Sequence, residues 1–446
     1  MGYLQSRPDG MTRGLQRVGH RLAAAFPGMS SWMARLRMVP QARALHFGGL
    51  AADMAAKPAQ IPAQPLRFPS PDPTLGPGVN IYGYLRGQFG LGESARQYAR
   101  ALLQAGYPVD LADVRISIPH ACGDDSLASL LEHGVSHGIN VVFVNPDHYH
   151  EVRPQLAAGG YTIGFWFWEL DTIPDEWMAA VDQVDEIWVA SSFVEEAFRR
   201  ATAKPVIRIP HPVRPSDAAM LPRGSFDLDE DAFVFLCSFD FNSSIHRKNP
   251  FAVIDAFAMA FPNPGARVQL LVKTSNGHRY PEQLDRLCRH ASRVPRVLVR
   301  DQILTSDRVS AMQHAADAYV SLHRAEGLGM GMAESMAIGK PVIATAWSGN
   351  LDFMDDQNSC LVPCRLVPVL DGEYPHAQHA QWADASIEVA ADWMRRLATS
   401  PALAEERGGR AREAIAKSMD PAAAATAMIA RLRSLGNGTC RGPLRH

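Results

Sequence analysis

Residues 324–337 read RAEGLGMGMAESMA, and this stretch decides what fold we expect for the chain. Gly327, Gly329 and Gly331 alternate with apolar residues, and each glycine disfavours a helix by about 1 kcal/mol. We therefore expect a loop over 327–331 and a helix over 332–338. Glycine allows positive φ and close backbone approach. Amides of such a loop and of the helix that follows form a site for an anion such as a diphosphate.

Two glutamates flank this loop. Glu326 precedes the glycines and Glu334 follows them, with seven residues between the two glutamates. Carboxylate oxygens accept hydrogen bonds from sugar and ribose hydroxyls. The alternative is that Glu326 is a turn residue and that Glu334 complements the dipole of its helix.

Outward from the loop, apolar runs alternate with helical stretches in both halves of the chain. The expected strands are 79–84, 108–114, 139–144, 162–168, 186–190, 206–209, 233–238, 268–274, 297–299, 318–322 and 341–345. The expected helices are 93–105, 194–201, 250–261, 307–316 and 332–338, with Ala-rich helical sequence over 380–434. Alternating strands and helices predict parallel sheets, which bind ligands at the carboxyl ends of their strands.

Composition shifts divide the chain. We expect a basic, Pro/Ala-rich leader and linker (1–78), an N-terminal Rossmann-like domain (79–215), an interdomain linker (216–230), a C-terminal Rossmann-like domain (231–400) and C-terminal helices with a tail (401–446). Two such α/β domains with parallel sheets would face each other across a cleft.

The pattern Glu-Gly-x-Gly-x-x-x-Ala-Glu-Ser-Met-Ala, with Pro341–Thr345 and Gly349-Asn350 after it, resembles the E-x7-E motif of family-4 retaining glycosyltransferases. The resemblance covers roughly residues 79–400 and implies the GT-B fold. It also implies that Glu326 holds hydroxyls of a donor sugar and Glu334 the nucleotide ribose. Gly327, Leu328 and Gly329 would approach the phosphates and the sugar.

A second match is His246-Arg247-Lys248-Asn249-Pro250, where the family has a basic pair on the donor diphosphate. A fixed cation neutralises charge that builds up on a leaving diphosphate. Lys248 matches the family lysine. The family arginine usually comes a few residues earlier, where this chain has Asp240, and Arg247 is the candidate to replace it. The alternative is a solvated basic loop.

A third match is the glycine-rich segment 83–94, with Gly90 and Gly92 as donor-side candidates across the cleft. Its glycines follow the order G-x-x-G-x-G, which differs from the G-x-G-x-x-G of dinucleotide-binding proteins. An NAD-dependent oxidoreductase therefore stays an alternative that the spacing disfavours.

The resemblance also suggests residues by position alone. His148, with His150 behind it, would lie near the sugar, and Asp301 and Ile303 would frame the base. Trp166, Trp168 and Glu169 are candidates for contacts with an acceptor sugar, although the two tryptophans are equally suited to a core.

Composition limits the partners. A net charge of -2 over 446 residues gives no sign of nucleic-acid binding, and six irregularly spaced cysteines favour a reducing, cytoplasmic setting. The leader is basic, with Arg13, Arg17 and Arg21 four residues apart. This spacing fits a helix on the inner face of an anionic membrane, or solvated charges.

The sequence thus predicts a retaining glycosyltransferase with a UDP-, GDP- or dTDP-sugar as donor, a carbohydrate or lipid-linked acceptor and no required metal or other cofactor. Bacterial polysaccharide or glycolipid synthesis is the expected pathway. A catalytically silent GT-B partner protein is the other alternative.

Overall fold

The computed structural model describes residues 68–436, except residues 71, 73, 75, 119, 132 and 216–219. The predicted leader helix with Arg13, Arg17 and Arg21 lies outside the described residues. Among the helices that are described, none combines the length and apolar character needed to span a membrane.

The N-lobe, residues 79–213, contains a six-stranded sheet in the order β2-β1-β3-β4-β5-β6, and every pair is parallel. Its strands are β1 (Val79–Gly83), β2 (Val109–Asp113), β3 (Ile139–Phe143), β4 (Tyr161–Phe165), β5 (Glu186–Val189) and β6 (Val206–Arg208). Its helices are α4 (Gly90–Gln104), α5 (Tyr149–Val152), α6 (Met178–Val181) and α7 (Ser192–Ala201).

The C-lobe, residues 233–418, contains a second parallel sheet in the order β12-β11-β10-β7-β8-β9. Its strands are β7 (Phe233–Asp240), β8 (Val268–Ser275), β9 (Val297–Asp301), β10 (Ala318–Ser321), β11 (Val342–Thr345) and β12 (Cys360–Val362). Counted within the lobe this is the doubly wound order 3-2-1-4-5-6, whose strand order reverses between β7 and β10. A ligand is expected at the carboxyl ends of those two strands.

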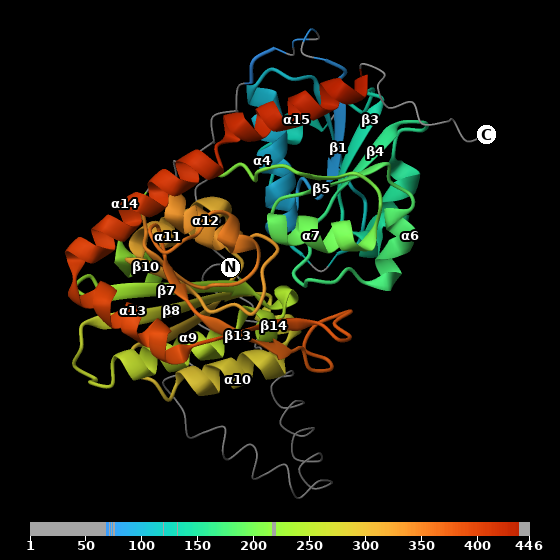
Figure 1. The fold of residues 1–446 in the computed structure, drawn as a ribbon. Helices are drawn as coiled ribbons and strands as arrows, with labels where there is room; N and C mark the ends of the chain where they lie inside the picture. Colours follow the sequence, from blue (N-terminus) through green and yellow to red (C-terminus); the bar gives the residue numbers. More distant parts are fainter. Residues whose placement is uncertain are drawn as a thin grey trace, which may run out of the picture. The chain divides into compact units, whose positions relative to one another are not determined.

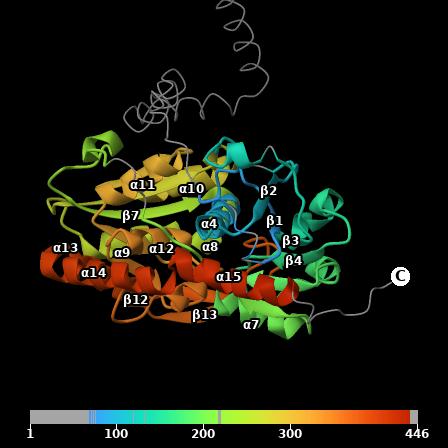
Figure 2. The same cartoon turned by 90° about the horizontal axis from the view of Figure 1, so that it is seen from above.

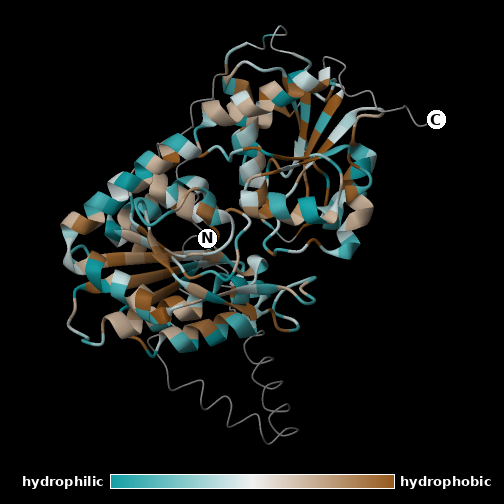
Figure 3. Cartoon of the chain, in the orientation of Figure 1, coloured by the Kyte–Doolittle hydropathy of each residue, from teal (hydrophilic) through white to brown (hydrophobic). Residues whose placement is uncertain are grey.

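Helices cover both faces of the C-lobe sheet (Figure 1). They are α8 (Ile245–Lys248), α9 (Pro250–Ala260), α10 (Pro281–Ala291), α11 (Ser306–Ala315), α12 (Met330–Ala337), α13 (Ile387–Thr399) and α14 (Pro401–Ser418). The strands are the most hydrophobic parts of both lobes (Figure 3), as expected for parallel sheets that are buried on both faces.

The last helix returns to the N-lobe. In two views at right angles, α14 and α15 (Pro421–Gly436) follow one another along the same side of the two lobes (Figures 1 and 2). α14 packs on α12 and α13, whereas α15 packs on α4. Arg431 of α15 pairs with Glu186 of β5, whose side chain is fully buried. In the described part of the predicted segment 401–446, α14 therefore belongs to the C-lobe and α15 to the N-lobe.

The expected strands all form, with shifted ends, and three helices begin two or three residues earlier than predicted: α4, α7 (at Ser192, not 194) and α12. α4 begins at Gly90, three residues before the predicted start. α12 begins at Met330 and includes Gly331, because Gly329 alone takes positive φ, at 97°, and serves as the N-cap. Helices α5, α6, α8 and α10 and strand β12 were not predicted.

Residues 381–385 were predicted to be helical and instead form a strand. β13 (Cys364–Pro368) and β14 (Gln381–Ala385) pair as an antiparallel hairpin. Trp382 and Ala383 are fully buried there. The alanines that suggested a helix are thus small core residues of a strand.

Candidate donor site

The site lies at the carboxyl ends of β7 and β10. After β7 the chain turns into the single turn of α8, which ends in Arg247 and Lys248. After β10 it enters the loop that contains Glu326 and leads into α12. The strand order of the sheet therefore brings together two segments that are 78 residues apart in the sequence.

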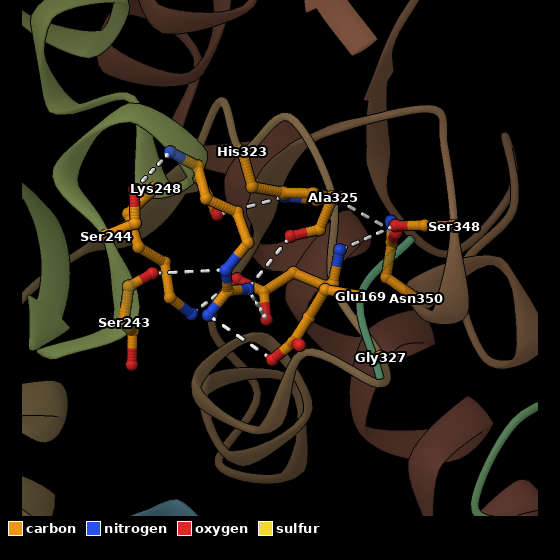
Figure 4. Close-up of polar contacts among 12 residues, drawn as sticks. Glu169, Ser243, Ser244, Lys248, His323, Ala325, Gly327, Ser348 and Asn350 are labelled. Atoms are coloured by element: carbon orange, nitrogen blue, oxygen red, sulfur yellow. Dashed lines mark hydrogen bonds and ion pairs between the residues drawn. The ribbon is translucent and has the colours of Figure 1, made fainter. Parts of the chain in front are cut away.

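Glu326 lies between two cations. Figure 4 shows the surroundings of this cluster, with Lys248, Glu169 and Ser348 labelled. Lys248 Nζ donates a hydrogen bond to Glu326 Oε1, and Arg247 Nη1 lies 3.2 Å from Oε2. Glu326 is only 7% exposed. Burial opposes its ionisation most strongly, but Lys248 and Arg247 together lower the pKa of Glu326 to about 2. The carboxylate is therefore charged at any physiological pH.

Arg247 is held from several sides. It donates to Ala325 O at 3.0 Å and to Ser243 O at 3.1 Å, and it lies 3.4 Å from Glu169 of the N-lobe. Its guanidinium lies over the ring of Tyr374. Burial opposes its charge, yet Glu169 and Glu326 raise the pKa of Arg247 above its ordinary value. Lys248, by contrast, has Glu326 as its one ion-pair partner among the described residues and is 21% exposed.

Close backbone contacts fix the glycine loop. Ser348 Oγ accepts a hydrogen bond from Glu326 N, and Gly349 N donates to Glu326 O, both at 2.9 Å. A Cβ on Gly349 would lie 2.2 Å from Gly327 O, and one on Gly327 would lie 2.7 Å from Trp168 O of the N-lobe. Ser191 Oγ of the N-lobe donates to Gly327 O at 2.6 Å. Both lobes therefore shape this loop, in which Leu328 is buried.

His323 belongs to the site and was not predicted from the sequence. It is fully buried and contacts Ser321 Oγ, Trp347 O and Asn350 Oδ1 at 3.1–3.2 Å. Burial lowers its pKa, so the imidazole is neutral. It follows β10 directly in the sequence, but no spacing pattern singles it out. Tyr374, from the loop between β13 and β14, escaped for the same reason.

Glu334 is separate from this cluster. It lies on α12 and accepts a hydrogen bond from Gln313 Nε2 at 3.1 Å. Burial is the main reason that the pKa of Glu334 rises to about 7. With Met330 it lines a small cavity of about 30 Å³ whose other walls are Gln97 and His211–Val213 of the N-lobe and Arg214, which follows the N-lobe.

The remaining donor-side candidates have different surroundings. A Cβ on Gly92 would lie 2.5 Å from Gly87 O, whereas one on Gly90 would meet nothing within 4 Å. Asp301 accepts hydrogen bonds from Thr274 Oγ1 at 2.9 Å and from Gly277 N at 3.0 Å. Ile303 is 45% exposed, which leaves it available to a ligand.

The acceptor candidates separate into two groups. Trp166 and Trp168 are 0% and 4% exposed, so both belong to the N-lobe core and neither presents a ring face to a sugar in this structure. Glu169 reaches the site, where it accepts a hydrogen bond from Tyr374 Oη at 2.7 Å and faces Arg247.

His148 is not joined to the Glu326 cluster by any contact among the described residues; it pairs with Glu151 at 2.8 Å and is exposed. Beside it lies a cavity of about 230 Å³, lined by residues that include Asp147, His150, Glu176 and Trp177.

The part of the chain that contains the site resembles a known protein family. Residues 233–371, which contain the site, match the family model described as glycosyl transferases group 1. No curated protein matches the chain.

Solved structures resemble the whole described fold. Sucrose-phosphate synthase from Thermosynechococcus elongatus is 19% identical with a TM-score of 0.56, and the match covers 81% of this chain and all of that one. HepE from Anabaena, in complex with UDP and glucose, is 14% identical with a TM-score of 0.58, covering 80% of this chain and all of that one.

A variant of TarM from S. aureus is 12% identical with a TM-score of 0.49, and this chain spans 55% of its length. Two parallel six-stranded sheets, the likeness to full-length synthase and HepE structures and the match over residues 233–371 together give this chain the GT-B fold of glycosyltransferases.

Proposed function

We propose that the protein is a retaining glycosyltransferase that moves a sugar from a nucleotide-sugar donor to a hydroxyl of an acceptor. The observation that carries the proposal is the cluster of Lys248, Arg247 and Glu326 at the strand-order reversal of the C-lobe sheet. A donor offers a negatively charged diphosphate and a sugar rich in hydroxyls, and the cluster holds a group suited to each.

Each side chain has a distinct task in this proposal. Lys248 is the cation that meets the diphosphate, because it has a single ion-pair partner in the described part of the chain and is partly exposed. Arg247 holds Glu326 and the loop in place through its contacts with Ala325 and Glu169. Glu326 binds sugar hydroxyls, Glu334 binds the ribose, and the segment of Asp301 and Ile303 frames the base.

The reaction forms a bond from the acceptor oxygen to the anomeric carbon and breaks the bond from that carbon to the diphosphate, whose leaving oxygen takes up the proton of the acceptor hydroxyl. Lys248 and the amides of the glycine loop stabilise the leaving diphosphate, which lowers the barrier electrostatically. Retention requires the acceptor to approach the face that the diphosphate leaves. Contacts of the N-lobe with the glycine loop exclude water and limit donor hydrolysis.

The proposal also covers the donor nucleotide, the acceptor and the location of the protein. The HepE complex contains UDP and glucose, so UDP-sugars are the first donors to test, before GDP- and dTDP-sugars. We propose an acceptor from polysaccharide or glycolipid synthesis in the cytoplasm, with the basic leader in contact with the membrane surface.

The experiment is a panel of UDP-, GDP- and dTDP-sugars and NAD, with binding and donor hydrolysis measured for the wild-type protein and for Glu326→Gln. We expect a nucleotide-sugar to bind and to be hydrolysed slowly, and NMR of the released sugar to show the donor's anomeric configuration. Binding of NAD alone would favour an oxidoreductase, and binding without turnover on any acceptor would favour a silent partner protein.

Glu326→Gln should lower hydrolysis and transfer by at least ~100-fold, the usual scale for losing a group that acts on the transition state. It should bind UDP as well as the wild type or better, because Lys248 and Arg247 lose their counter-charge. The free variant should be destabilised by about 3 kcal/mol. Glu186→Gln is the matched control, since it removes another buried carboxylate paired with an arginine. It should lose stability and keep turnover; normal turnover in Glu326→Gln would refute the site.

A further inference from the structure

Lys273 is a buried cation to which the proposed mechanism gives no task. It lies on β8 and is 8% exposed. Among the described residues its ammonium has no hydrogen bond and no ion pair, whereas Lys248 pairs with Glu326 and Lys340 donates to His314 O at 2.8 Å. Burial lowers the pKa of Lys273, while the more distant Asp240 and Asp301 oppose this effect.

The two nearby carboxylates are already engaged by other donors. Asp240 accepts hydrogen bonds from Asn242 N and Asn276 Nδ2, both at 2.8 Å. Asp301 Oδ1 accepts from Thr274 and Gly277. Among the described residues no ion pair joins either carboxylate to Lys273, and both act on it only at longer range. The stem of Lys273 is buried, whereas its Nζ has no partner among the described residues and keeps access to solvent, so a ligand can reach it.

The sheet places Lys273 beside the donor site. In the register of the sheet it lies between Ser238 of β7 and Arg300 of β9. Side chains alternate along a strand, so Lys273 shares a face with Leu271, which packs in one cluster with Tyr319 and Met332. Helix α12, which follows the glycine loop, packs on strands β10 and β11, and its buried hydrophobic residues join the same core cluster as Leu271.

Contacts through Tyr319 link β7, the neighbour of Lys273 in the sheet, with the glycine loop 327–331. Tyr319 Oη donates to Ser238 O at 3.2 Å, and a Cβ on Gly331 would lie 2.8 Å from that hydroxyl. The carboxyl ends of the sheet therefore run from Glu326 after β10, through β7, to Lys273 on β8 and Asp301 on β9. Lys273 falls between the groups assigned to the sugar and those assigned to the base.

We propose that Lys273 binds an oxygen of the nucleoside diphosphate half of the donor, on either a phosphate or a base carbonyl. An ammonium donates to both kinds of oxygen, and a bound oxygen would supply the partner that Lys273 lacks. This inference rests on the proposed function, because it needs a nucleotide at the carboxyl ends of the C-lobe strands.

The test measures the affinity of the wild type, Lys273→Met and Lys273→Gln for UDP by titration calorimetry, together with the melting temperature of each free protein. Both variants should bind UDP at least tenfold more weakly and melt at or above the wild-type temperature. Lys340→Met is the matched control, since it removes a lysine that has a partner. It should melt lower and bind UDP normally.

Titrations with uridine and with inorganic pyrophosphate distinguish a base carbonyl oxygen from a phosphate oxygen as the partner of Lys273. A loss of affinity for pyrophosphate assigns Lys273 to a phosphate, and a loss for uridine assigns it to the base. Wild-type affinity of both variants for UDP would overturn the inference and leave the proposed function intact. Variants that melt lower or fail to fold would also overturn it, by showing that Lys273 stabilises the free protein. If the wild type binds none of UDP, GDP and dTDP, both proposals fall.

Discussion

Glu334 carries a carboxyl group that titrates near neutral pH. Its pKa is about 7 in the folded protein, against an ordinary value of 4.5. The folded chain therefore holds this proton more tightly than the unfolded chain does. Stability from this group is complete below about pH 4.5 and is lost as pH rises toward 7.

Glu334→Gln should consequently be neutral for stability at pH 4 and stabilising at pH 8, by about 1 kcal/mol because the group is partly exposed. Thermal unfolding at the two pH values checks this. In the wild type, affinity for the donor should rise through pH 7, since an ionised carboxylate accepts ribose hydroxyls more strongly. A melting difference that is equal at both pH values would contradict the assignment.

The site residues that could be predicted from the sequence are those that stand in short motifs. Glu326, Arg247 and Lys248 stand in short motifs, and the fold brings all three together. Their proposed roles in catalysis stay predictions. His323 and Tyr374 were missed because their contacts depend on segments far along the chain. Lys273 was missed because a lysine in a strand gives no sign of whether it has a partner.

Gly349 constrains the glycine loop from the short helix that it opens. It opens a short 3-10 helix, Gly349–Asp352, and its Cα faces the backbone of Gly327. Gly349→Ala should push the loop away, weaken donor binding at least tenfold and cost about 2 kcal/mol of stability, a typical penalty for overpacking. Titration with UDP and thermal unfolding measure the two effects.

Gly409→Ala is the control for that change. Gly409 lies inside α14, and a Cβ there would meet nothing within 4 Å. Alanine should stabilise this helix by up to about 1 kcal/mol and leave UDP binding unchanged. If Gly349→Ala and Gly409→Ala behaved alike, close packing would not be what requires glycine at 349.

Strands could be predicted from the sequence because parallel strands buried on both faces are short, continuous apolar runs. Helix starts were less certain, since one glycine with positive φ, at 329, ends the loop and the next, at 331, is helical. The β13–β14 hairpin could not be predicted, because its antiparallel pairing joins residues separated by a loop of 12. Pairing of that kind leaves no local periodicity.

At the scale of the whole molecule, Asp352 connects the lobes. It lies in the C-lobe and accepts hydrogen bonds from Ser192 N at 2.8 Å and Arg208 Nη1 at 3.0 Å, both in the N-lobe. Ser192 is the first residue of α7, so the carboxylate also neutralises the positive end of that helix.

Asp352→Ala should lower stability by about 2 kcal/mol and increase the radius of gyration in small-angle scattering, because the lobes lose a charged contact. Asp392→Ala removes an exposed aspartate that is paired within its own helix, and it should change neither quantity. An unchanged radius of gyration in Asp352→Ala would show that the other contacts between the lobes suffice.

The return of α15 to the N-lobe means that the chain passes between the lobes twice. The two passages touch, since Val213 N donates to Met419 O at 2.9 Å. Two covalent links that meet at one point act as a pivot: they permit the lobes to swing apart but resist sliding and twisting. Because Pro212, Val213 and Arg214 share a cavity wall with Glu334, that cavity lies beside the pivot, where a swing separates the lobes least. Glu334 should therefore stay in contact with the N-lobe while parts of the lobes farther from the pivot open to admit a nucleotide.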